Sequence, residues 1–387
     1  MKIAYVGDFI NHGKSLQTAG TSLVLLFSSI KDVEFIDVYC PLLNEKIEPF
    51  EPPNNVRINE YYRYDDSLSI LRLLKVKWKK YDLLIFNILP TSFGDSSISN
   101  VSGLLIPIIA SKVEKVNIVR VIYHNSVYTN DFVRLGYDSF YDRVRVFFLS
   151  FVEKVIFKNV DTYVLLNLYK ERIDKLIGKN RVSYWDARYI EAITTLYLNN
   201  NFDTEEILKE KNEIPVILMH GYWGPQKNLE LGLSALKNIK ERGVKFKLII
   251  SGSINYHFPD YEGVFYEILK KYSEIIDKYI ALVPEKKIMH LFVTADLLIL
   301  PYNTPGGHSG VLEQAIFFKT PTIAIDFPEF REQASGCDSV TLKMANDLQE
   351  SISKLLIEPI LPRTIKVKEN FQIAKDNITS HILDKLR

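Results

Sequence analysis

The sequence contains only two cysteines, Cys40 and Cys337, among 387 residues. They lie in different halves of the chain, and no pair has the C-x-x-C spacing of a zinc ribbon or a redox motif. Small secreted domains depend on several disulfides for their stability. The scarcity of cysteine therefore argues against a disulfide framework and indicates a reducing compartment.

The chain also lacks an excess of charge of either sign. It carries 48 Lys and Arg against 47 Asp and Glu, which gives a net charge of +1. A protein that binds nucleic acid through its overall field needs a large basic excess. We therefore expect no nucleic acid partner, and recognition of an anion has to be local.

Long apolar runs are missing as well. No stretch reaches the ~18 apolar residues that a membrane-spanning helix requires, and the uncharged segment Ser96–Ser111 is interrupted by Gly103 and Pro107. The chain opens on a strand-like segment without a secretory signal. Together with the reducing compartment, these absences lead us to expect a cytoplasmic protein.

What the sequence does have is a repeated alternation of short apolar segments and helix-compatible stretches. Strand, helix and strand in repetition predict parallel sheets covered on both faces. The expected fold class is α/β, with two doubly wound Rossmann-like domains facing a cleft at the carboxyl ends of their sheets. The predicted strands are 2–7, 33–39, 81–86, 116–123 and 161–166 in the first half, and 215–220, 246–251, 279–283, 297–300 and 322–325 in the second.

The alternation loosens across Val182–Lys211, which contains three consecutive asparagines and the charged run Glu205–Lys211. We place the domain junction in this stretch. The prediction is an N-terminal domain at 1–205, a C-terminal domain at 206–365, and a terminal helix at 366–387 that packs back on the first domain. Helices are also predicted at 21–30, 229–242, 264–276 and 285–294.

One loop near the N-terminus invites a P-loop interpretation, because Gly13-Lys14-Ser15 follows the first strand. The P-loop spacing requires a glycine at position 8, where the chain has Asp8. Since the ring of backbone amides depends on that spacing, a flexible loop is the favoured interpretation.

The stretch 295–316 carries the clearest chemical signal. The apolar run Leu297–Leu300 stops at a proline and predicts a buried parallel strand, after which Gly306, Gly307 and Gly310 open a helix that bears Glu313. The first amides of a helix lack intrahelical partners, and together with the helix dipole they attract an anion. The pattern predicts a phosphate site, with Glu313 placed to accept hydrogen bonds from ribose hydroxyls. A tight turn of purely structural role is the alternative.

A second loop follows the first strand of the second half. The segment Gly221–Lys227, with sequence G-Y-W-G-P-Q-K, is rich in turn residues and opens a helix. Both loops follow strands of one sheet and therefore reach the same edge. Lys227 is expected to neutralise a diphosphate there.

The two loops resemble those of the donor-binding domain of retaining GT-B glycosyltransferases, most of all glycosyltransferase family 4. That family has a G-R-x-x-x-x-K loop after the first strand of its second domain, and two glutamates eight positions apart around a glycine-rich turn. The resemblance covers residues 214–335. It implies a nucleoside diphosphate sugar as donor, with Gly221 and Lys227 at the diphosphate and Glu313 at the ribose.

Two positions depart from the family pattern: Tyr222 stands where the family has Arg, and Pro305 where it has the first glutamate. Each loss removes charge-assisted hydrogen bonds of about 1.5–3 kcal/mol where they are desolvated. We expect recognition of the donor sugar to depend on the backbone amides of Gly306–Gly310, together with His308 and Ser309.

In the first half the resemblance is mainly architectural. A strand ends in Val121-Ile122-Tyr123-His124, where the family often has a histidine facing the donor sugar. The resemblance thus implies a catalytic role for His124 beside Lys227 and retention of anomeric configuration. Neither loop requires a metal, and no cofactor is expected besides the donor substrate.

The segment Leu71–Tyr81 is basic and aromatic, with four lysines around Trp78. Such a segment can rest on an anionic membrane surface, which suits a lipid-linked acceptor. A solvated helix face is the alternative. Peripheral association with the cytoplasmic face of a membrane is therefore an expectation of the sequence.

The leading functional hypothesis is a hexosyltransferase that moves a sugar from a nucleoside diphosphate sugar to an acceptor hydroxyl in glycan or glycolipid biosynthesis. The first alternative is a non-catalytic sugar-nucleotide-binding or scaffold subunit that kept the fold. The second is an epimerase of the same two-domain architecture.

Overall fold

The computed structural model describes residues 1–11, 16–42, 50–112, 118–128, 139–199, 214–255, 258–357 and 363–383. The chain forms two compact units, and the division falls between Thr194 and Thr195 and again between Asn370 and Phe371. The Gly13-Lys14-Ser15 loop lies outside the described residues.

The first unit is built on a seven-stranded sheet of order β3-β2-β1-β4-β5-β6-β7, in which every pairing is parallel. Its central strand β4 is buried at every position, as expected for a strand covered on both faces. The strands are β1 (Lys2–Gly7), β2 (Phe35–Pro41), β3 (Val56–Tyr62), β4 (Leu83–Ile88), β5 (Val119–Tyr123), β6 (Asp161–Val164) and β7 (Val182–Tyr184).

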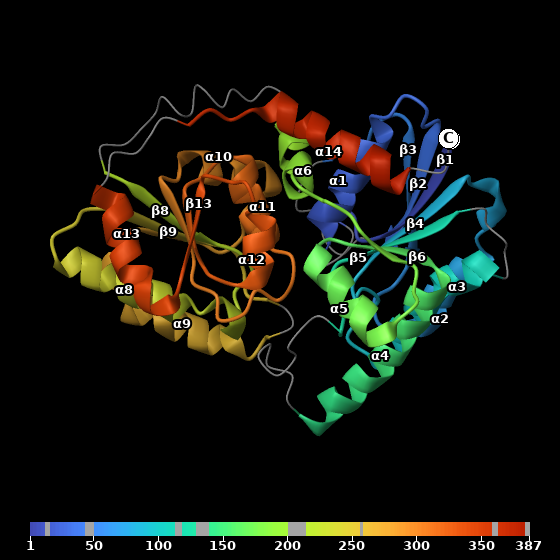
Figure 1. Cartoon of the computed structure of the whole chain (residues 1–387), viewed down its shortest axis with the longest axis horizontal. Helices are drawn as coiled ribbons and strands as arrows, with labels where there is room; N and C mark the ends of the chain where they lie inside the picture. The colour runs from blue at the N-terminus through green and yellow to red at the C-terminus, as the bar shows by residue number, and fades with distance from the viewer. Residues whose placement is uncertain are drawn as a thin grey trace. The chain divides into compact units, whose positions relative to one another are not determined.

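Helices lie between these strands in sequence (Figure 1). The largest core cluster of this unit joins β1, β4 and β5 to helices α3, α4 and α5. Within the same unit, α14 is tied down by Lys375 Nζ, which donates to the carbonyl of Ser29 at 2.7 Å. The helices are α1 (Gln17–Ser28), α2 (Ser67–Ile70), α3 (Ser97–Lys112), α4 (Phe140–Asn159), α5 (Asn167–Ile177), α6 (Ile190–Leu198) and α14 (Val367–Ile382).

The second unit holds a six-stranded parallel sheet of order β10-β9-β8-β11-β12-β13. Helices α8, α9 and α13 pack with this sheet in one apolar core. Its strands are β8 (Val216–His220), β9 (Lys247–Ser251), β10 (Lys278–Ile280), β11 (Leu297–Leu300), β12 (Thr322–Ile325) and β13 (Val340–Lys343), and its helices are α8 (Leu229–Glu241), α9 (Tyr261–Lys271), α10 (Glu285–Thr294), α11 (Gly310–Phe317), α12 (Pro328–Gln333) and α13 (Leu348–Ile357).

The predicted fold class, two doubly wound parallel sheets, is confirmed. Three strands were missed by the sequence prediction: β3, β7 and β13. None of the three is a buried apolar run, because β3 is buried only at its two ends, β7 is three residues long and β13 is half-buried throughout. The first helix begins at Gln17 rather than Thr21.

The segment Leu71–Tyr81 is not the continuous helix face that the sequence suggested. It forms two short 3-10 turns, η1 (Leu71–Lys75) and η2 (Trp78–Lys80). The Trp78 side chain is fully buried and packs edge-on against Tyr39, with ring centroids 5.2 Å apart. The indole is therefore part of the core and is not available to a membrane, although the lysines around it are exposed.

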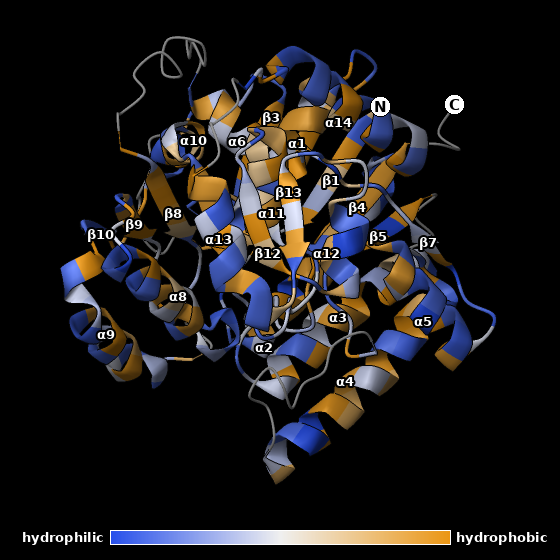
Figure 2. Ribbon diagram, turned by 60° about the vertical axis from the view of Figure 1, so that its left-hand side comes forward, coloured by the Kyte–Doolittle hydropathy of each residue, from blue (hydrophilic) through white to orange (hydrophobic). Residues whose placement is uncertain are grey.

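None of the described helices combines the length and the apolar character needed to cross a bilayer. Hydropathy along the ribbon shows the usual arrangement of apolar strands inside and mixed helices outside (Figure 2). The helix α4 also exposes several large apolar side chains.

Two glycines fix how closely β8 and β9 approach at their carboxyl ends. Gly252 has φ +108°, and a Cβ on it would lie 1.9 Å from the carbonyl oxygen of Gly221. The amide of Gly221 in turn donates to the carbonyl of Ser251 at 3.2 Å. A side chain at 252 therefore meets backbone that cannot rotate away, directly beside the loop that carries Lys227.

We predict that Gly252→Ala lowers the urea midpoint of the protein by much more than Gly243→Ala. Gly243 also has a positive φ, +86°, but a Cβ there meets nothing within 4 Å. The control therefore shows only the conformational cost of about 1–2 kcal/mol, whereas Gly252→Ala adds an overpacking cost of about 1–3 kcal/mol. Equal midpoints for the two variants would contradict the close approach.

Candidate active site

The two loops predicted to hold phosphate meet at the carboxyl edge of the second sheet. Asn303, after β11, donates its amide N–H to the carbonyl of Gln226 and its Nδ2 to the carbonyl of Pro225, both at 3.1 Å. On the other side, a Cβ on Gly221 would lie 3.5 Å from Cγ2 of Val311, in the first turn of α11. The loop after β8 and the loop after β11 are thus held together by direct contacts.

Lys227 ends the short 3-10 turn η3 (Pro225–Lys227) within this structure. Its Nζ lies 3.7 Å from the ring centroid of Tyr302, the second residue after β11. Desolvation of the ammonium group lowers the pKa of Lys227 to about 7. No described carboxylate forms an ion pair with it, so the aromatic face is its main electrostatic support.

The lysine also affects its neighbour His220, the last residue of β8. Burial and then the charge of Lys227 lower the pKa of His220 to about 4. The imidazole Nδ1 is 2.8 Å from Oγ of Ser251. At neutral pH the ring is therefore uncharged, and positive charge in this part of the site is concentrated on Lys227.

The glycine turn before α11 has the backbone conformation that its residues predict. Gly306 and Gly307 have φ of +63° and +113°, and Ser309 is the N-cap, its Oγ accepting from the amide of Leu312 at 3.3 Å. Gln333 of α12 clamps the same serine: its Oε1 accepts from the Ser309 amide at 3.1 Å and its Nε2 donates to the Ser309 carbonyl at 2.7 Å. The turn is thereby fixed to α12, with the first-turn amides of Gly310 and Val311 at the head of the helix.

Glu313 and His308 approach each other inside the turn. Nε2 of His308 is 3.3 Å from Oε2 of Glu313, and both side chains are almost completely buried. The carboxylate predicted to bind ribose therefore already has the imidazole beside it. In this arrangement Glu313 orients His308, and any contact with a ribose hydroxyl would be made next to that ring.

The two positions that depart from the family pattern lie on the same loops. The side chain of Tyr222 is 53% exposed and follows Gly221 directly. Pro305 is half-buried immediately before Gly306. Neither residue supplies a charge, so the positive charge that the second unit offers on these loops comes from Lys227 and from the N-terminal end of α11.

In the first unit, His124 begins a directed chain of buried hydrogen bonds. Its Nε2 is 2.6 Å from Oδ1 of Asn87; because an amide oxygen only accepts, Nε2 carries the proton. Asn87 Nδ2 then donates to the Tyr5 hydroxyl at 3.0 Å, and that hydroxyl donates to the carbonyl of Asp8 at 3.0 Å. The chain runs across β5, β4 and β1, and fixes both the tautomer and the orientation of His124.

The loop that follows His124 is held by Glu153 of α4, a fully buried carboxylate. It accepts from the Tyr123 hydroxyl at 2.8 Å, from Ser126 Oγ at 2.5 Å, and from the amide of Val127 at 3.0–3.1 Å. Burial raises the pKa of Glu153 to about 7, against the lowering effect of these donors. Glu153 is thus a positioning residue for the His124 loop.

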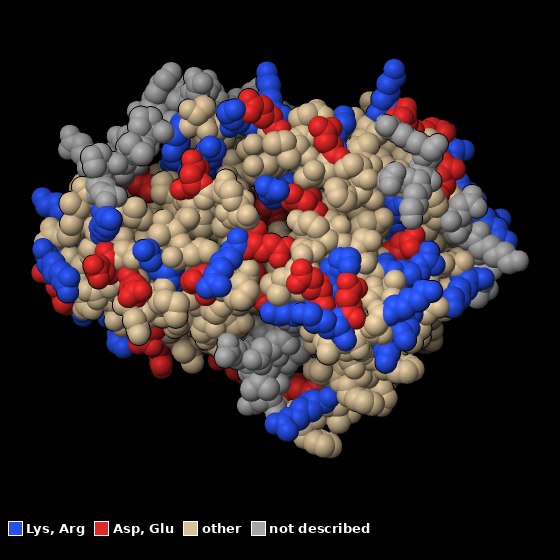
Figure 3. All heavy atoms as spheres, in the orientation of Figure 1, with Lys and Arg blue, Asp and Glu red and all other residues tan. Residues whose placement is uncertain are grey.

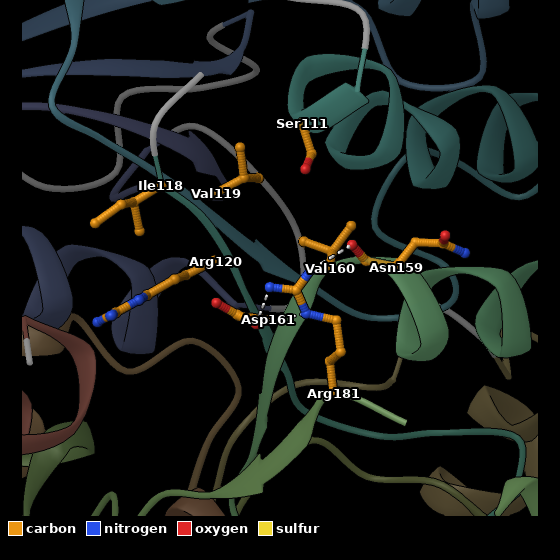
Figure 4. A pocket seen from close by; sticks show the side chains of 8 residues that line it. All are labelled: Ser111, Ile118, Val119, Arg120, Asn159, Val160, Asp161 and Arg181. Carbon is orange, nitrogen blue, oxygen red and sulfur yellow. Dashed lines mark hydrogen bonds and ion pairs between the residues drawn. The ribbon is translucent and has the colours of Figure 1, made fainter. Parts of the chain in front are cut away.

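A small pocket in the first unit belongs to neither loop system. It lies at the amino ends of β5 and β6, opposite the edge that carries His124, and Figure 4 shows Arg181 directed at Asp161 while Arg120 points away from that pair. The lining residues are Ser111, Ile118, Val119, Arg120, Asn159, Val160, Asp161 and Arg181.

Within the part of the chain that the structure describes, no three histidine, cysteine or acidic side chains come together in the way a metal site requires. The site residues described above are accordingly a lysine, backbone amides, histidines and hydrogen-bonding side chains.

Comparison with protein families gives one match, and it covers the unit that holds these loops. Residues 200–370 match the family described as glycosyl transferases group 1. The second unit is therefore similar to the domain of group 1 glycosyl transferases. No curated protein sequence matches the chain.

Several solved structures share the whole two-domain fold of this chain at low sequence identity. Sucrose-phosphate synthase from Thermosynechococcus elongatus is 13% identical with a TM-score of 0.64, covering 98% of this chain and 94% of that one. Anabaena HepE in complex with UDP and glucose is 13% identical with a TM-score of 0.62, covering 100% and 99%. A Listeria monocytogenes protein described as UDP-N-acetylglucosamine 2-epimerase is 13% identical with a TM-score of 0.56, covering 100% and 97%. The expected GT-B fold is confirmed.

Several residues of the site had no signal in the sequence. Tyr302 and Asn303 of the loop after β11 contact the loop after β8, Gln333 of α12 contacts Ser309, and Asn87 and Glu153 hold His124 and its loop from other elements of the first unit. Only Glu153 carried a hint, since it is a lone acid on the inner face of an otherwise apolar helical stretch. The predicted site residues Gly221, Lys227, Gly306, Gly307, His308, Ser309, Gly310 and Glu313 all lie in the second unit, and His124 lies in the first.

We predict that the protein loses stability relative to its Glu153→Gln variant as the pH rises from 4.5 to 7. The folded-state pKa of about 7 is above the ordinary value of 4.5, so the folded protein holds a proton that the unfolded chain releases. The amide imitates the protonated acid and has no such slope. The difference amounts to about 3 kcal/mol, measured by urea unfolding at several pH values.

The control for this prediction is Glu267→Gln, which changes an exposed glutamate of α9. It should leave the pH slope of wild type intact. A Glu153→Gln variant that keeps the wild-type slope would show that Glu153 is ionised throughout this range.

Proposed function

We propose that the protein transfers a hexose from a nucleoside diphosphate sugar to an acceptor hydroxyl, with retention of anomeric configuration and without a metal. The acceptor belongs to a glycan or a glycolipid. HepE was solved with UDP and glucose, which makes UDP-glucose the first donor to test. The second unit binds the donor, and the first unit presents the acceptor.

One observation carries the proposal: a desolvated lysine lies over the ring of Tyr302, in the loop that leads to α11, and has no described counter-ion. A diphosphate supplies the missing negative charge. The amides of Gly310 and Val311 and the dipole of α11 then add to the same stabilisation. Because negative charge grows on the diphosphate as the sugar leaves, these groups stabilise the transition state more than the ground state.

In the proposed reaction the bond between the anomeric carbon and the diphosphate oxygen breaks while the bond from that carbon to the acceptor oxygen forms. The acceptor proton passes to the departing phosphate, and the nucleoside diphosphate is released. Lys227 holds the phosphate, and Glu313 with His308 holds the ribose side of the turn. His124, fixed as a donor to Asn87 by its Nε2, is proposed to line the sugar site from the first unit.

A non-catalytic nucleotide-binding subunit is the second candidate, and the specific observation in its favour is the loss of charge at Tyr222 and Pro305. An epimerase of the same fold is the third, since such a protein is among the similar structures. Incubation with UDP-, GDP- and ADP-sugars separates the three: transfer or slow hydrolysis supports the proposal, isomerisation without acceptor supports an epimerase, and binding without turnover supports the non-catalytic subunit.

We predict that Lys227→Met lowers kcat/KM for the donor by about 100-fold or more, as removal of a preorganised transition-state contact does. Lys245→Met is the control, because Lys245 is an exposed lysine that follows α8 and has no part in these loops. The methionine keeps the apolar stem over Tyr302, so the melting temperature should change little. Activity of Lys227→Met within a few-fold of wild type would remove Lys227 from the proposed mechanism.

We also predict that UDP binding at pH 8 is accompanied by uptake of a proton. With a pKa of about 7, Lys227 is mostly neutral at pH 8 in the free protein, and a bound diphosphate raises that pKa. Calorimetry in buffers of different ionisation enthalpy measures the uptake directly. It should approach one proton in wild type and vanish in Lys227→Met; equal uptake in both would assign the proton to another group.

A further inference from the structure

The helix α4 carries an apolar stripe that faces away from its own unit. Five residues on it are exposed at spacings of 4, 3, 1 and 3, which place them on one side of a helix. They are Phe140 (83% exposed), Val144 (37%), Phe147 (70%), Phe148 (57%) and Phe151 (65%). Tyr141, 66% exposed, lies at the edge of this stripe.

The stripe lies on the face of α4 that turns away from the core. The buried residues of the helix are Leu149, Val152, Glu153, Ile156 and Phe157, of which the last four lie in its second half. The first half is capped by Ser139 and Asp142 in a reciprocal capping box, and Val146 and Leu149 pack it against the core. Figures 1 and 2 both show this end of α4 projecting past the rest of the first unit.

Basic residues accompany the stripe. Lys154 and Lys158 follow Phe140 by 14 and 18 residues, which returns them to the same side of the helix, and both are exposed. Arg143 is exposed beside the stripe. The one unburied acid of α4, Asp142, is engaged by the amide and hydroxyl of Ser139 at 3.3 and 2.6 Å. In Figure 3 this end of the molecule shows tan atoms beside blue ones.

We propose that this face of α4 docks on the surface of an anionic lipid bilayer. Exposed phenylalanines in a row, followed by lysines on the same side, match an interfacial helix, whose rings enter the headgroup region while its cations meet lipid phosphates. A second copy of the chain is disfavoured as occupant, because paired α4 helices would bring an uncompensated set of cations together. The stripe replaces Leu71–Tyr81 as the membrane surface of this protein.

The position of the stripe also bears on which acceptor substrate would meet the protein after docking. Because α4 follows β5, its N-terminal end lies at the carboxyl edge of the first sheet, the edge at which His124 follows β5, and the stripe begins there. On the proposed function, docking would bring that edge to the headgroups and so favour a lipid-linked acceptor. This last step depends on the proposed function, whereas the docking itself does not.

The test is flotation of the full chain with vesicles of phosphatidylcholine and phosphatidylglycerol in equal amounts, and of phosphatidylcholine alone, without donor or acceptor. Wild type should float with the anionic vesicles, and Phe147→Ser combined with Phe151→Ser should bind at least 10-fold more weakly. The matched control is Leu176→Ser combined with Ile357→Ser, which removes two apolar side chains of similar exposure, 62% and 73%, elsewhere. That control should bind as wild type does.

The contribution of the lysines is tested by comparing two double variants. The first pair of changes is Lys154→Glu with Lys158→Glu, and the second is Lys77→Glu with Lys79→Glu. The first pair should lose binding to anionic vesicles and the second should keep it. The reverse result would return the membrane surface to the Leu71–Tyr81 segment and overturn the proposal. Failure of wild type to float, or loss of a dimer in sedimentation equilibrium on changing Phe147 and Phe151, would overturn it as well.

A spectroscopic readout confirms the site of contact. The three native tryptophans, Trp78, Trp185 and Trp223, are at most 2% exposed, so they report little contact with lipid. Phe148→Trp should show a blue shift on addition of anionic vesicles and quenching by brominated lipid, and Leu176→Trp should show neither. Transferase activity is not needed for any of these measurements, so a failure of the docking is distinguishable from a failure of the proposed function.

Discussion

The loops at the carboxyl edge of the second sheet hold one partly buried ammonium group that pairs with no carboxylate among the described residues. Lys227 is held over the ring of Tyr302, and that ring follows the neighbouring strand β11. The arrangement requires the loops after β8 and β11 to be joined, which Asn303 does through the carbonyls of Pro225 and Gln226. Burial of a charge costs free energy, and a nearby negative charge lowers that cost.

In the first unit, hydrogen bonds position a histidine side chain. His124 is positioned by a chain of hydrogen bonds through Asn87 and Tyr5, in which each donor and acceptor is assigned. The adjoining loop is held by Glu153, which satisfies several donors at once. Buried networks of this kind orient a side chain more exactly than packing does, because every member constrains its neighbours. The charged group thus lies in the second unit, and the histidine oriented by hydrogen bonds lies in the first.

Much of the second unit could be predicted from the sequence because its signals are local. The bounds of Leu297–Leu300, Thr322–Ile325 and Glu285–Thr294 were predicted to the residue, since each is an apolar run or an amphipathic helix ended by a turn. The strands β3 and β13 carry no such run. Contacts such as those of Tyr302 with Lys227 and of Gln333 with Ser309 arise only when distant segments fold together. For the same reason the burial of Trp78 was not predicted, since its partner Tyr39 lies on another strand.

The capping box of α4 has a consequence for the local energetics of the first unit. The turns between Ser139 and Phe148 contain no fully buried residue and contact the core through the partly buried Val146, and helical turns with few tertiary contacts are only marginally stable in water. Their amides should therefore open by local fraying, independently of global unfolding. The second half of the same helix holds Glu153 and is anchored in the core. One continuous helix thus joins a segment of low local stability to the residue that sets the loop after His124.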